Sequence, residues 1–417
     1  MIRRFFLVVT ALVVAEYYSF IATRGLLRYV PPFWRNVGMG AYIVLSVLLW
    51  VLLLSFRRIP WDSMPSFVRT IAISFAMGFF IAKILVALFL LLDDVRRLVM
   101  WALGYLRQKP TLVGDGSRIP RSVFVQNAAI GVGTAVIGLF LYGTTNRYRY
   151  RIHRVKLRLP NIPKGFDGFK MVQLSDIHSG SFDNRKAVAE GIRKIMAEKP
   201  EVIFFTGDLV NNESPEIVPY KDLFGSLRAP MGVYSTLGNH DYGDYVSWPD
   251  EETKARNLQM LERHHAEMGW KLMQNVHTYL ERNGDTIGLI GIENWGAKAG
   301  FPKYGDMPKA TAGLDREKAP FNILLSHDPS HWDAQVRPEY PWIDLTFSGH
   351  THGMQFGVDI PGFKWSPVQY VYEQWAGLYR KGKQHLYVNR GFGFLGYPGR
   401  VGILPEITVI TLESGAA

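Results

Sequence analysis

At 417 residues the chain is long for one domain, and with 48% hydrophobic and 20% charged residues we expect at least two domains without extensive disorder. The absence of cysteine excludes disulfides, thiolate metal sites and a cysteine nucleophile. The net charge of +11 comes entirely from residues 1–158, which carry 21 Lys/Arg and 5 Asp/Glu, whereas residues 159–417 carry 26 and 31. This excess of acidic residues argues against a long nucleic acid as partner of the second part.

Four apolar stretches lie in the first 142 residues: Phe5–Ala22, Val37–Phe56, Phe67–Leu92 and Val123–Tyr142. Each approaches or exceeds the roughly 20 residues that cross the core of a bilayer, and arginine and tryptophan flank them as at membrane interfaces. The sequence therefore predicts a four-helix transmembrane region over residues 1–145, in a multi-pass protein of the cell membrane. The first stretch also fits a signal peptide, although no small-residue cleavage site follows it.

Two ionisable residues, Glu16 and Lys83, lie inside the first and third stretches. These stretches cross the membrane in the same direction, so the two side chains fall at similar depth. A charge in lipid needs a partner or a path to the interface. The sequence leaves open a Glu16–Lys83 pair and separate snorkelling of each side chain.

The side of the membrane that carries the C-terminal part is not determined. With the N-terminus inside, the Lys/Arg tally is 11 inside and 9 outside, a weak preference for a cytoplasmic domain. By contrast, Pro120-Arg121-Ser122-Val123-Phe124 resembles a twin-arginine export signal with one arginine. The two indications oppose each other.

From about residue 150 the pattern is that of strands alternating with helices. Residues 151–159 alternate basic and apolar, which predicts an edge strand. Five short apolar runs follow, each ending in a polar cluster: Phe169–Leu174, Val202–Thr206, Gly232–Leu237, Phe321–Leu325 and Leu345–Phe347. Helical patterns over Asn184–Glu198 and Glu252–Glu267 separate several of these runs. We therefore expect an α/β domain over residues 146–417.

The polar clusters supply the candidate site residues. In open α/β sheets ligands gather at the carboxyl ends of strands, and here those ends carry Asp176, His178, Asp208, Asn239, His240, His327, His350 and His352. Small Gly and Ser neighbours permit sharp turns beside them. Oxygen and imidazole ligands without thiolate favour Mn, Fe or Zn over Mg or Ca. The set is too large for one ion and predicts two, about 3.5–4 Å apart.

The motif blocks D-x-H at 176–178, G-D at 207–208, G-N-H-D at 238–241, S-H-D at 326–328 and G-H-T-H at 349–352 resemble the calcineurin-like metallophosphoesterase superfamily over about residues 150–413. The resemblance implies a four-layer α/β/β/α double β-sandwich with a two-metal site. Every motif position is filled, which predicts an active, metal-dependent hydrolase of phosphoric esters or pyrophosphates.

The resemblance also implies a role for each site residue. It assigns Asp176, His178 and His352 to the first metal, Asn239, His327 and His350 to the second, and Asp208 to a bridging position. A hydroxide between the metals attacks phosphorus in line. His240 stabilises the transition state or protonates the leaving oxygen, and Asp241 orients the ring of His240.

A narrower resemblance concerns the bacterial branch with an N-terminal membrane segment and the motif G-H-T-H-G-x-Q, which here spans residues 349–355. That branch includes cell-wall-associated phosphoesterases and UDP-2,3-diacylglucosamine hydrolases, which implies a lipid-linked phosphate or pyrophosphate substrate at the bilayer. Two alternatives stay open. One is a tethered nucleotide phosphodiesterase, and the other is a membrane sensor or transporter that the metal domain regulates.

The surroundings of the site give further indications. The stretch from Asn239 to His327, with a tight turn at Asn283-Gly284-Asp285, leaves no room for a large cap domain and predicts an open site. Nearby aromatic residues form either an apolar lip at the lipid interface or part of the core: Trp248, Trp295, Phe301, Tyr304, Phe356, Phe363, Trp365, Tyr370, Tyr372 and Trp375. Four basic residues contact phosphate or headgroups, or lie on a solvated face: Arg380, Lys381, Lys383 and Arg390.

Overall fold

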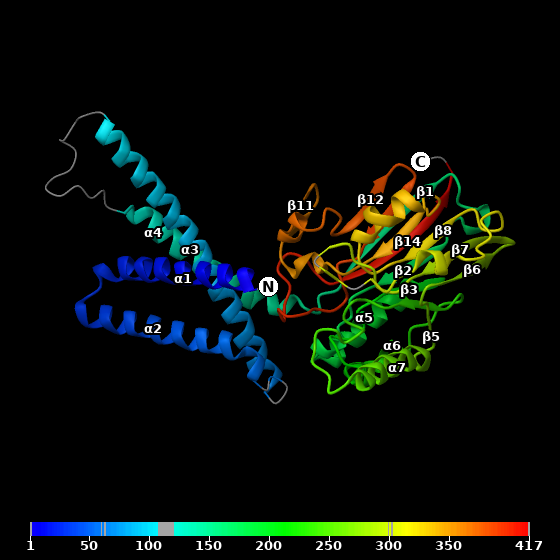
Figure 1. Cartoon of the computed structure of the whole chain (residues 1–417), viewed down its shortest axis with the longest axis horizontal. Coiled ribbons are helices and arrows are strands. Elements are labelled where there is room, and N and C mark those ends of the chain that lie inside the picture. The colour runs from blue at the N-terminus through cyan, green and yellow to red at the C-terminus, as the bar shows by residue number, and fades with distance from the viewer. Residues whose placement is uncertain are drawn as a thin grey trace. The chain divides into compact units, whose positions relative to one another are not determined.

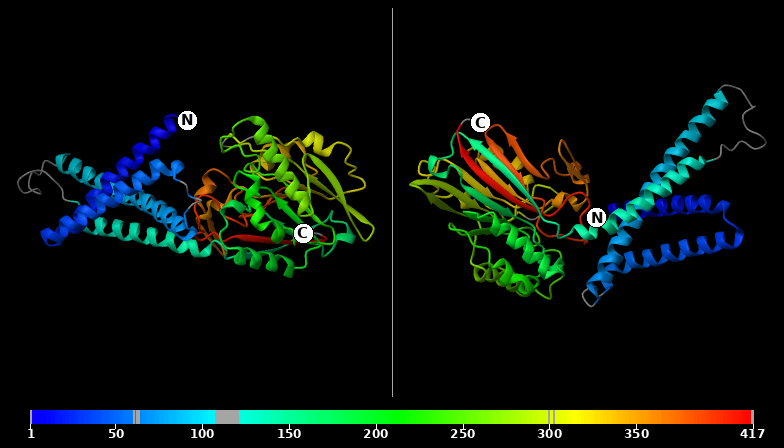
Figure 2. Two further views of the ribbon diagram at one scale, coloured as in Figure 1. Left: turned by 90° about the horizontal axis from the view of Figure 1, so that it is seen from below. Right: turned by 180° about the vertical axis from the view of Figure 1, so that it is seen from behind.

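The structure is a computed structural model that describes residues 2–59, 61, 64–106, 121–298, 300–301 and 303–415, without the side chains of residues 2–8, 57 and 106. The chain divides into two compact units, Met1–Thr144 and Thr145–Ala417. Figures 1 and 2 show the first unit as long helices and the second as mixed sheets with helices.

The first unit consists of apolar helices. Its α-helices are α1 (Ile2–Leu26), α2 (Pro32–Ser55), α3 (Ser66–Leu106) and α4 (Val123–Gly143). In the described part of the chain, α2, α3 and α4 are long and apolar enough to cross a membrane. The predicted stretch Phe5–Ala22 lies within α1. The side chains of its first four residues are not among those described, so a fourth span stays a prediction. Helix α3 continues beyond the predicted stretch, and its 41 residues extend about 60 Å.

Glu16 and Lys83 form an ion pair between α1 and α3, so pairing is confirmed and separate snorkelling is wrong. The Glu16 carboxylate also accepts hydrogen bonds from Tyr42 Oη and Trp50 Nε1, both at 2.9 Å. Lys83 Nζ also donates to Ser46 Oγ at 2.8 Å. Because the last three residues belong to α2, one polar cluster joins three helices inside the membrane unit.

Arg121, from the stretch that resembles an export signal, has a partner within the membrane unit. Its Nη2 donates to Asp94 Oδ2 at 2.7 Å, and Tyr18 Oη donates to the same oxygen at 2.8 Å. This ion pair gives Arg121 a structural role at the start of α4. Pro120 lies outside the described residues.

The second unit contains two six-stranded sheets among its described residues. The first has the order β1 (Arg151–Leu159), β14 (Glu406–Ser414), β2 (Lys170–Leu174), β3 (Val202–Thr206), β4 (Val233–Thr236) and β5 (Trp270–Leu272). The second has the order β12 (Gly377–Lys381), β13 (Gln384–Val388), β9 (Leu345–Ser348), β8 (Asn322–Leu325), β7 (Asp285–Gly291) and β6 (Val276–Arg282). Strands β2–β5 are mutually parallel, as are β7, β8, β9 and β13.

Strand β3 shows how the sheets pack. Its side chains alternate, so that Val202 and Phe204 enter a core shared with the second sheet, while Ile203 and Phe205 enter a core with helix residues such as Ile192. Both faces are buried, which explains the unbroken apolar run in the sequence. Helices α5 (Arg185–Ala197), α6 (Lys221–Phe224) and α7 (Glu251–Glu267) lie along this outer face.

The outer face of the second sheet has a core of its own, which includes Leu324 and Leu386. Met307 from the short helix α8 (Met307–Thr311) and Trp332 from the π-helical turn before α9 (Arg337–Glu339) pack there. The second unit is thus an α/β fold with mixed sheets.

Most predicted elements of the second unit are present, often with shifted ends. Strand β1 is an edge strand, and Asn184 caps α5 by accepting a hydrogen bond from Ala187 N at 3.0 Å. The tight turn joins β6 to β7 through Asn283 and Gly284, both with positive φ. The described residues between Asn239 and His327 form no separate cap, because their strands belong to the two sheets. Sequence reasoning did not predict β5 or the hairpin of β10 (Val358–Ile360) and β11 (Phe363–Trp365).

Candidate active site

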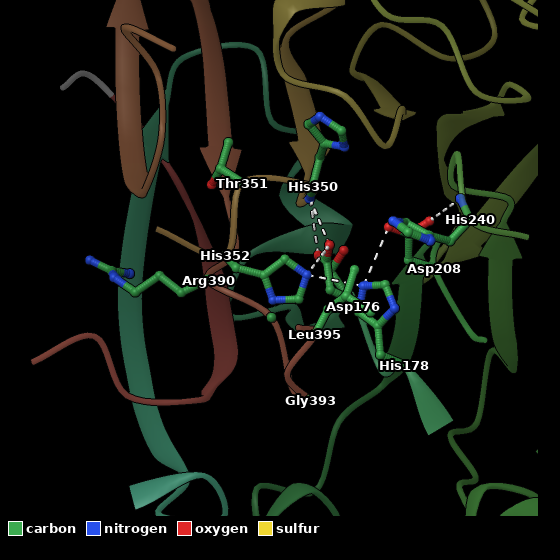
Figure 3. A network of polar contacts seen from close by, with 12 residues as sticks. Asp176, His178, Asp208, His240, His350, Thr351, His352, Arg390, Gly393 and Leu395 are labelled. Carbon is green, nitrogen blue, oxygen red and sulfur yellow. Dashed lines mark hydrogen bonds and ion pairs between the residues drawn. The ribbon is translucent and has the colours of Figure 1, made fainter. Parts of the chain in front are cut away.

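Five parallel strands place the predicted site residues at one edge of the two sheets. Asp176 and His178 follow β2, Asp208 follows β3, Asn239 and His240 follow β4, His327 follows β8, and His350 and His352 follow β9. Side chains of Asp176, His178 and His352 form one group of mutually close ligand atoms, and those of Asp208, His327 and His350 form another. Figure 3 shows several of these side chains converging.

In the first group, nitrogen and oxygen atoms point toward a common centre. His352 Nε2 lies 3.2 Å from Asp176 Oδ1 and 3.1 Å from His178 Nε2. All three side chains are buried. Two imidazole nitrogens at this distance are held by a shared proton in a metal-free site or by a cation that both coordinate.

The second group is arranged in the same way. His327 Nε2 lies 3.1 Å from Asp208 Oδ2, and His350 Nδ1 lies 2.8 Å from Asn239 Oδ1. The same Asp208 Oδ2 lies 3.5 Å from His178 Nε2 of the first group. Asp208 therefore offers one oxygen to both groups, which is the geometry of a bridging ligand.

The hydrogen bonding of these groups tests whether a metal fits. His327 Nε2 is buried and has no partner with hydrogen-bond geometry among the described residues, although a carboxylate lies within reach. Such an orphaned nitrogen is costly in a protein interior. A divalent cation between His327 and Asp208 satisfies both groups, so the residues fit divalent metal ions.

The electrostatics of the site point to the same need for positive charge. Burial lowers the pKa of His178 well below its ordinary value, which keeps the imidazole neutral, as a metal ligand must be. Burial opposes ionisation of Asp208, but the neighbouring His327 outweighs it and holds the pKa of Asp208 well below the usual range. Against burial, Asp208 raises the pKa of His327 to about 10. A proton on His327 thus supplies the positive charge beside the Asp208 carboxylate.

Five of the predicted ligands have a left-handed backbone conformation. The φ angles are 52° for Asp176, 48° for His178, 61° for Asp208, 70° for His350 and 50° for His352. Non-glycine residues rarely adopt this region, and such strain concentrates at functional sites. The turns aim each side chain back across the end of its strand and toward the other ligands.

Two glycines are required by close approach. A Cβ on Gly238 would lie 2.2 Å from Asp208 Oδ1, and a Cβ on Gly349 would lie 2.2 Å from Asp176 Oδ2. A side chain at Gly238 would displace the carboxylate of Asp208, and a side chain at Gly349 would displace the carboxylate of Asp176. This confirms the expectation that small residues beside the ligands permit the turns.

His240 lies at the rim of the site, with its ring centroid 5.0 Å from that of His178. Its Nδ1 pairs with the carbonyl oxygen of Asn211 at 2.7 Å, and because a carbonyl only accepts, Nδ1 carries the proton. The resemblance assigned this orienting role to Asp241, which is wrong.

Asp241 is instead buried beneath the loop that carries Asp208. It accepts hydrogen bonds from the backbone N–H groups of four residues: Asp208, Leu209, Val210 and Gly238. Burial and the adjacent Asp208 carboxylate raise the pKa of Asp241 to about 7, against these four donors. Consecutive residues at the end of β4 project in different directions, so Asp241 supports the loop while His240 faces the site.

Sequence reasoning missed Tyr245 and named Tyr372 only as an aromatic residue of the lip or the core, without its contact to a predicted ligand. The Tyr372 hydroxyl lies 3.0 Å from His350 Nε2 and donates to Asp328 Oδ2 at 3.4 Å. Asn239 Nδ2 donates to Tyr245 Oη at 2.9 Å. Neither tyrosine stands beside a motif in sequence, so only tertiary packing reveals them.

Gln355 had a motif position but no assigned role. Its side chain donates to the carbonyls of Tyr397 and Gly399 and accepts from Leu395 N at 2.7 Å. It thus holds the loop 395–399 next to the site. Arg400, at the end of this loop, is fully buried and lies 3.4 Å from His352 Nδ1.

The predicted lip and basic residues have mixed positions. Tyr372 and Trp375 are buried, whereas Phe363 and Tyr370 are exposed. Arg390 is buried between Glu406 and Asp359, and Lys381 pairs with Asp333. Arg390 therefore lies neither on a solvated face nor at a phosphate site, while Arg380 and Lys383 are exposed.

Comparison with known proteins agrees with this geometry. Residues 169–354 match the family described as "Calcineurin-like phosphoesterase". The "Uncharacterized metallophosphoesterase YkuE" of Bacillus subtilis is 33% identical over 271 residues, 63% of this chain and 84% of the relative. The chain belongs to the calcineurin-like phosphoesterase family. Residues 2–147 match a second family, described as "Probable Calcineurin-like phosphoesterase, transmembrane domain".

Two further relatives of this calcineurin-like phosphoesterase carry functional names. The "UDP-2,3-diacylglucosamine pyrophosphatase LpxG" of Chlamydia trachomatis is 29% identical over 58% of this chain and 83% of its own length. The "Phosphodiesterase YaeI" of Escherichia coli is 27% identical over 70% of this chain and 99% of its own length. The phosphoesterase is thus a membrane protein and a metal-dependent phosphoester hydrolase.

Proposed function

We propose that the protein is a membrane-anchored two-metal phosphoesterase that hydrolyses a phosphodiester or pyrophosphate bond of a lipid-linked substrate. The observation that carries the proposal is the position of Asp208 Oδ2, within 3.5 Å of His178 Nε2 and 3.1 Å of His327 Nε2. One carboxylate oxygen between two ligand groups supports two ions that share it. The anchor has four spans in this proposal, and the domain is a four-layer sandwich at the membrane of the cell.

The ligand roles follow from the two groups. Asp176, His178 and His352 hold one ion, Asn239, His327 and His350 hold the other, and Asp208 bridges them. Mn, Fe or Zn fits these oxygen and imidazole ligands better than Mg or Ca. When bound, the ions supply Lewis acidity that activates water and neutralises phosphoryl charge.

His240 completes the site as the residue that exchanges a proton with the substrate. Because Nδ1 is held by the Asn211 carbonyl, Nε2 is the nitrogen free to carry a proton to the leaving oxygen or to donate to a phosphoryl oxygen. Asp241 acts at a distance, by supporting the loop of Asp208.

The proposed substrate class rests on the anchor and on a relative. A domain joined directly to apolar helices works where lipid substrates are concentrated, which raises their effective concentration. The chlamydial relative is named for a lipid pyrophosphate. A diester that is not linked to lipid is the competing class, in keeping with the name of the relative from Escherichia coli.

The test uses the full chain, purified in detergent and loaded with Mn²⁺. It is assayed on bis-p-nitrophenyl phosphate, UDP-2,3-diacylglucosamine and a cyclic nucleotide. We expect hydrolysis of the generic diester and a higher kcat/KM on the lipid nucleotide. Asp208→Ala serves as the inactive variant, and Asp222→Ala, which removes an exposed carboxylate on α6, serves as the matched control.

The outcomes separate chemistry from substrate class. Activity on the generic diester with no preference for the lipid nucleotide sustains the two-metal hydrolase and directs the search to other lipid phosphates. Preference for the cyclic nucleotide contradicts the lipid-linked substrate. No hydrolysis of any substrate by metal-loaded protein contradicts the proposed reaction.

A further inference from the structure

The segment 354–371, which follows the last predicted ligand, exposes an unusual number of apolar side chains. Met354 is 59% exposed, Ile360 57%, Phe363 56% and Tyr370 77%. Val358 and Val371 are also exposed. These residues lie on and around the β10–β11 hairpin, labelled β11 in Figure 1, and we call the segment the apolar hairpin. Such clustering on a protein surface marks an interaction site.

The apolar hairpin is attached firmly to the domain and close to the site. Gly357 N donates to Val401 O at 2.9 Å, and Val401 N donates to Gln355 O at 2.8 Å. Ser366 Oγ donates to Gly353 O at 2.8 Å, next to His352. The exposed side chains are therefore displayed by an ordered element, since its N-terminal end is bonded to Val401, and Ser366, after its second strand, is bonded to Gly353.

The same loop is tied to the point where the chain leaves the membrane. The candidate span 123–146 ends at Asn146, whose Nδ2 donates to Arg400 O at 3.2 Å. Strand β1 begins at Arg151, so fewer than five residues separate the span from the sheet. At about 3.3–3.6 Å per residue, this connection is short, and the apolar hairpin is bonded to the same loop as Asn146.

The charges around the apolar hairpin suit a lipid surface. The one acidic side chain of its described residues, Asp359, is paired with Arg390 at 3.0 Å. Lys364 lies on the hairpin, where its Nζ donates to the carbonyl of Ala376 and to Tyr379 Oη, and Lys298 donates to the carbonyl of Val371. Apolar and aromatic side chains next to lysines are the composition that enters the headgroup region of anionic membranes.

We propose that the apolar hairpin inserts into the surface of the bilayer that anchors the chain. Ile360 and Phe363 lie on either side of its turn and enter the acyl boundary. One consequence rests on the proposed function: a lipid phosphate reaches His350 and His352, which directly precede this segment, without leaving the membrane.

The absence of cysteine permits a direct depth measurement. Ile360→Cys and Phe363→Cys are made separately in the full chain, labelled with an environment-sensitive fluorophore, and reconstituted in nanodiscs of phosphatidylcholine and phosphatidylglycerol. Some nanodiscs carry a nitroxide on the acyl chain. Glu281→Cys is the control, because Glu281 is an exposed residue next to the β6–β7 turn, on the edge strand β6 of the second sheet, to which the hairpin does not belong.

We expect blue-shifted emission from both hairpin labels and at least threefold stronger quenching by acyl nitroxides than at the Glu281 control. Emission and quenching equal to the control overturn the proposal. A hairpin label that is shielded from water but not quenched by lipid shows a protein occupant and also overturns it.

The measurement uses no substrate, so its failure is distinct from failure of the proposed function. Repeating it with Asp208→Ala in the same chain sharpens the distinction. Quenching that persists in this variant supports docking independent of turnover. Quenching that disappears with Asp208→Ala overturns the proposal that the apolar hairpin inserts into the bilayer independently of the catalytic site.

Discussion

The two units both bury clusters of charged side chains, and they differ in whether those charges satisfy one another. In the membrane unit, the Glu16 carboxylate faces Lys83, Tyr42 and Trp50, so that donors and acceptors match. In the catalytic unit, His178 Nε2 faces His352 Nε2, and buried His327 Nε2 lies 3.1 Å from Asp208 Oδ2 without hydrogen-bond geometry. The first cluster is complete without a ligand, whereas the ligand groups of the second fit a divalent cation.

This difference separates a structural cluster from a chemical one, although both consist of strongly polar groups in apolar surroundings. A satisfied cluster stabilises the association of helices and loses stability when a single partner is removed. An unsatisfied cluster is an energetic cost that ligand binding relieves. Substitutions in the two clusters should therefore have separable effects on metal content and on stability.

The largest effect is expected from Asp208→Ala. Because both ligand groups share Asp208, the variant should lose both ions, and diester hydrolysis should fall by more than about 100-fold, the upper range for groups that only support ligands. Elemental analysis of the purified chain should give about two ions in the wild type. Loss of only one ion would contradict the bridging role, and Asp222→Ala should retain both.

His240→Ala should separate metal binding from turnover. The ring is oriented by a carbonyl and not by a ligand, so the variant should keep its ions while kcat falls about 10²–10⁴-fold, as for loss of a general acid. Metal content and kcat measured on the same preparation decide the matter. A nearly normal kcat would remove His240 from the proposed reaction.

The membrane cluster should respond in stability and not in metal content. Glu16→Leu leaves buried Lys83 without a carboxylate, and an uncompensated buried charge costs about 3–5 kcal/mol. We expect thermal unfolding in detergent at a clearly lower temperature. The double variant Glu16→Leu with Lys83→Met should recover much of this loss, because it removes both charges. A double variant as unstable as Glu16→Leu alone would contradict the pair as the cause.

The smallest effect is expected from Asp241→Asn. The amide keeps the shape but offers two donors to a pocket of four backbone N–H groups, which costs about 1–3 kcal/mol for a mismatched buried group. Thermal stability and metal affinity should fall, while kcat at saturating Mn²⁺ stays close to normal. A large loss of kcat with both ions bound would instead indicate direct participation in the reaction.

Much of the fold and site follows from short-range patterns. The apolar run of β3 and the alternation of β1 depend on which faces are buried, and that periodicity is visible in the sequence. The convergence of the predicted site residues was predictable because each stands after a strand whose carboxyl end meets the others. The positions of β12, β13 and β14 were not predicted as strands. Strand β14, the last strand in sequence, lies between β1 and β2, and no local pattern indicates this pairing of distant segments.

Composition and periodicity by themselves determined the apolar helices and the strands that carry the predicted site residues, since these depend on neighbours in the chain. Tertiary structure alone decided that Asn211 orients His240, that Tyr372 reaches His350 and that Arg390 is buried with Glu406. Each of these contacts joins segments that are distant in sequence. Packing sets their distances, and neither residue type nor spacing encodes them.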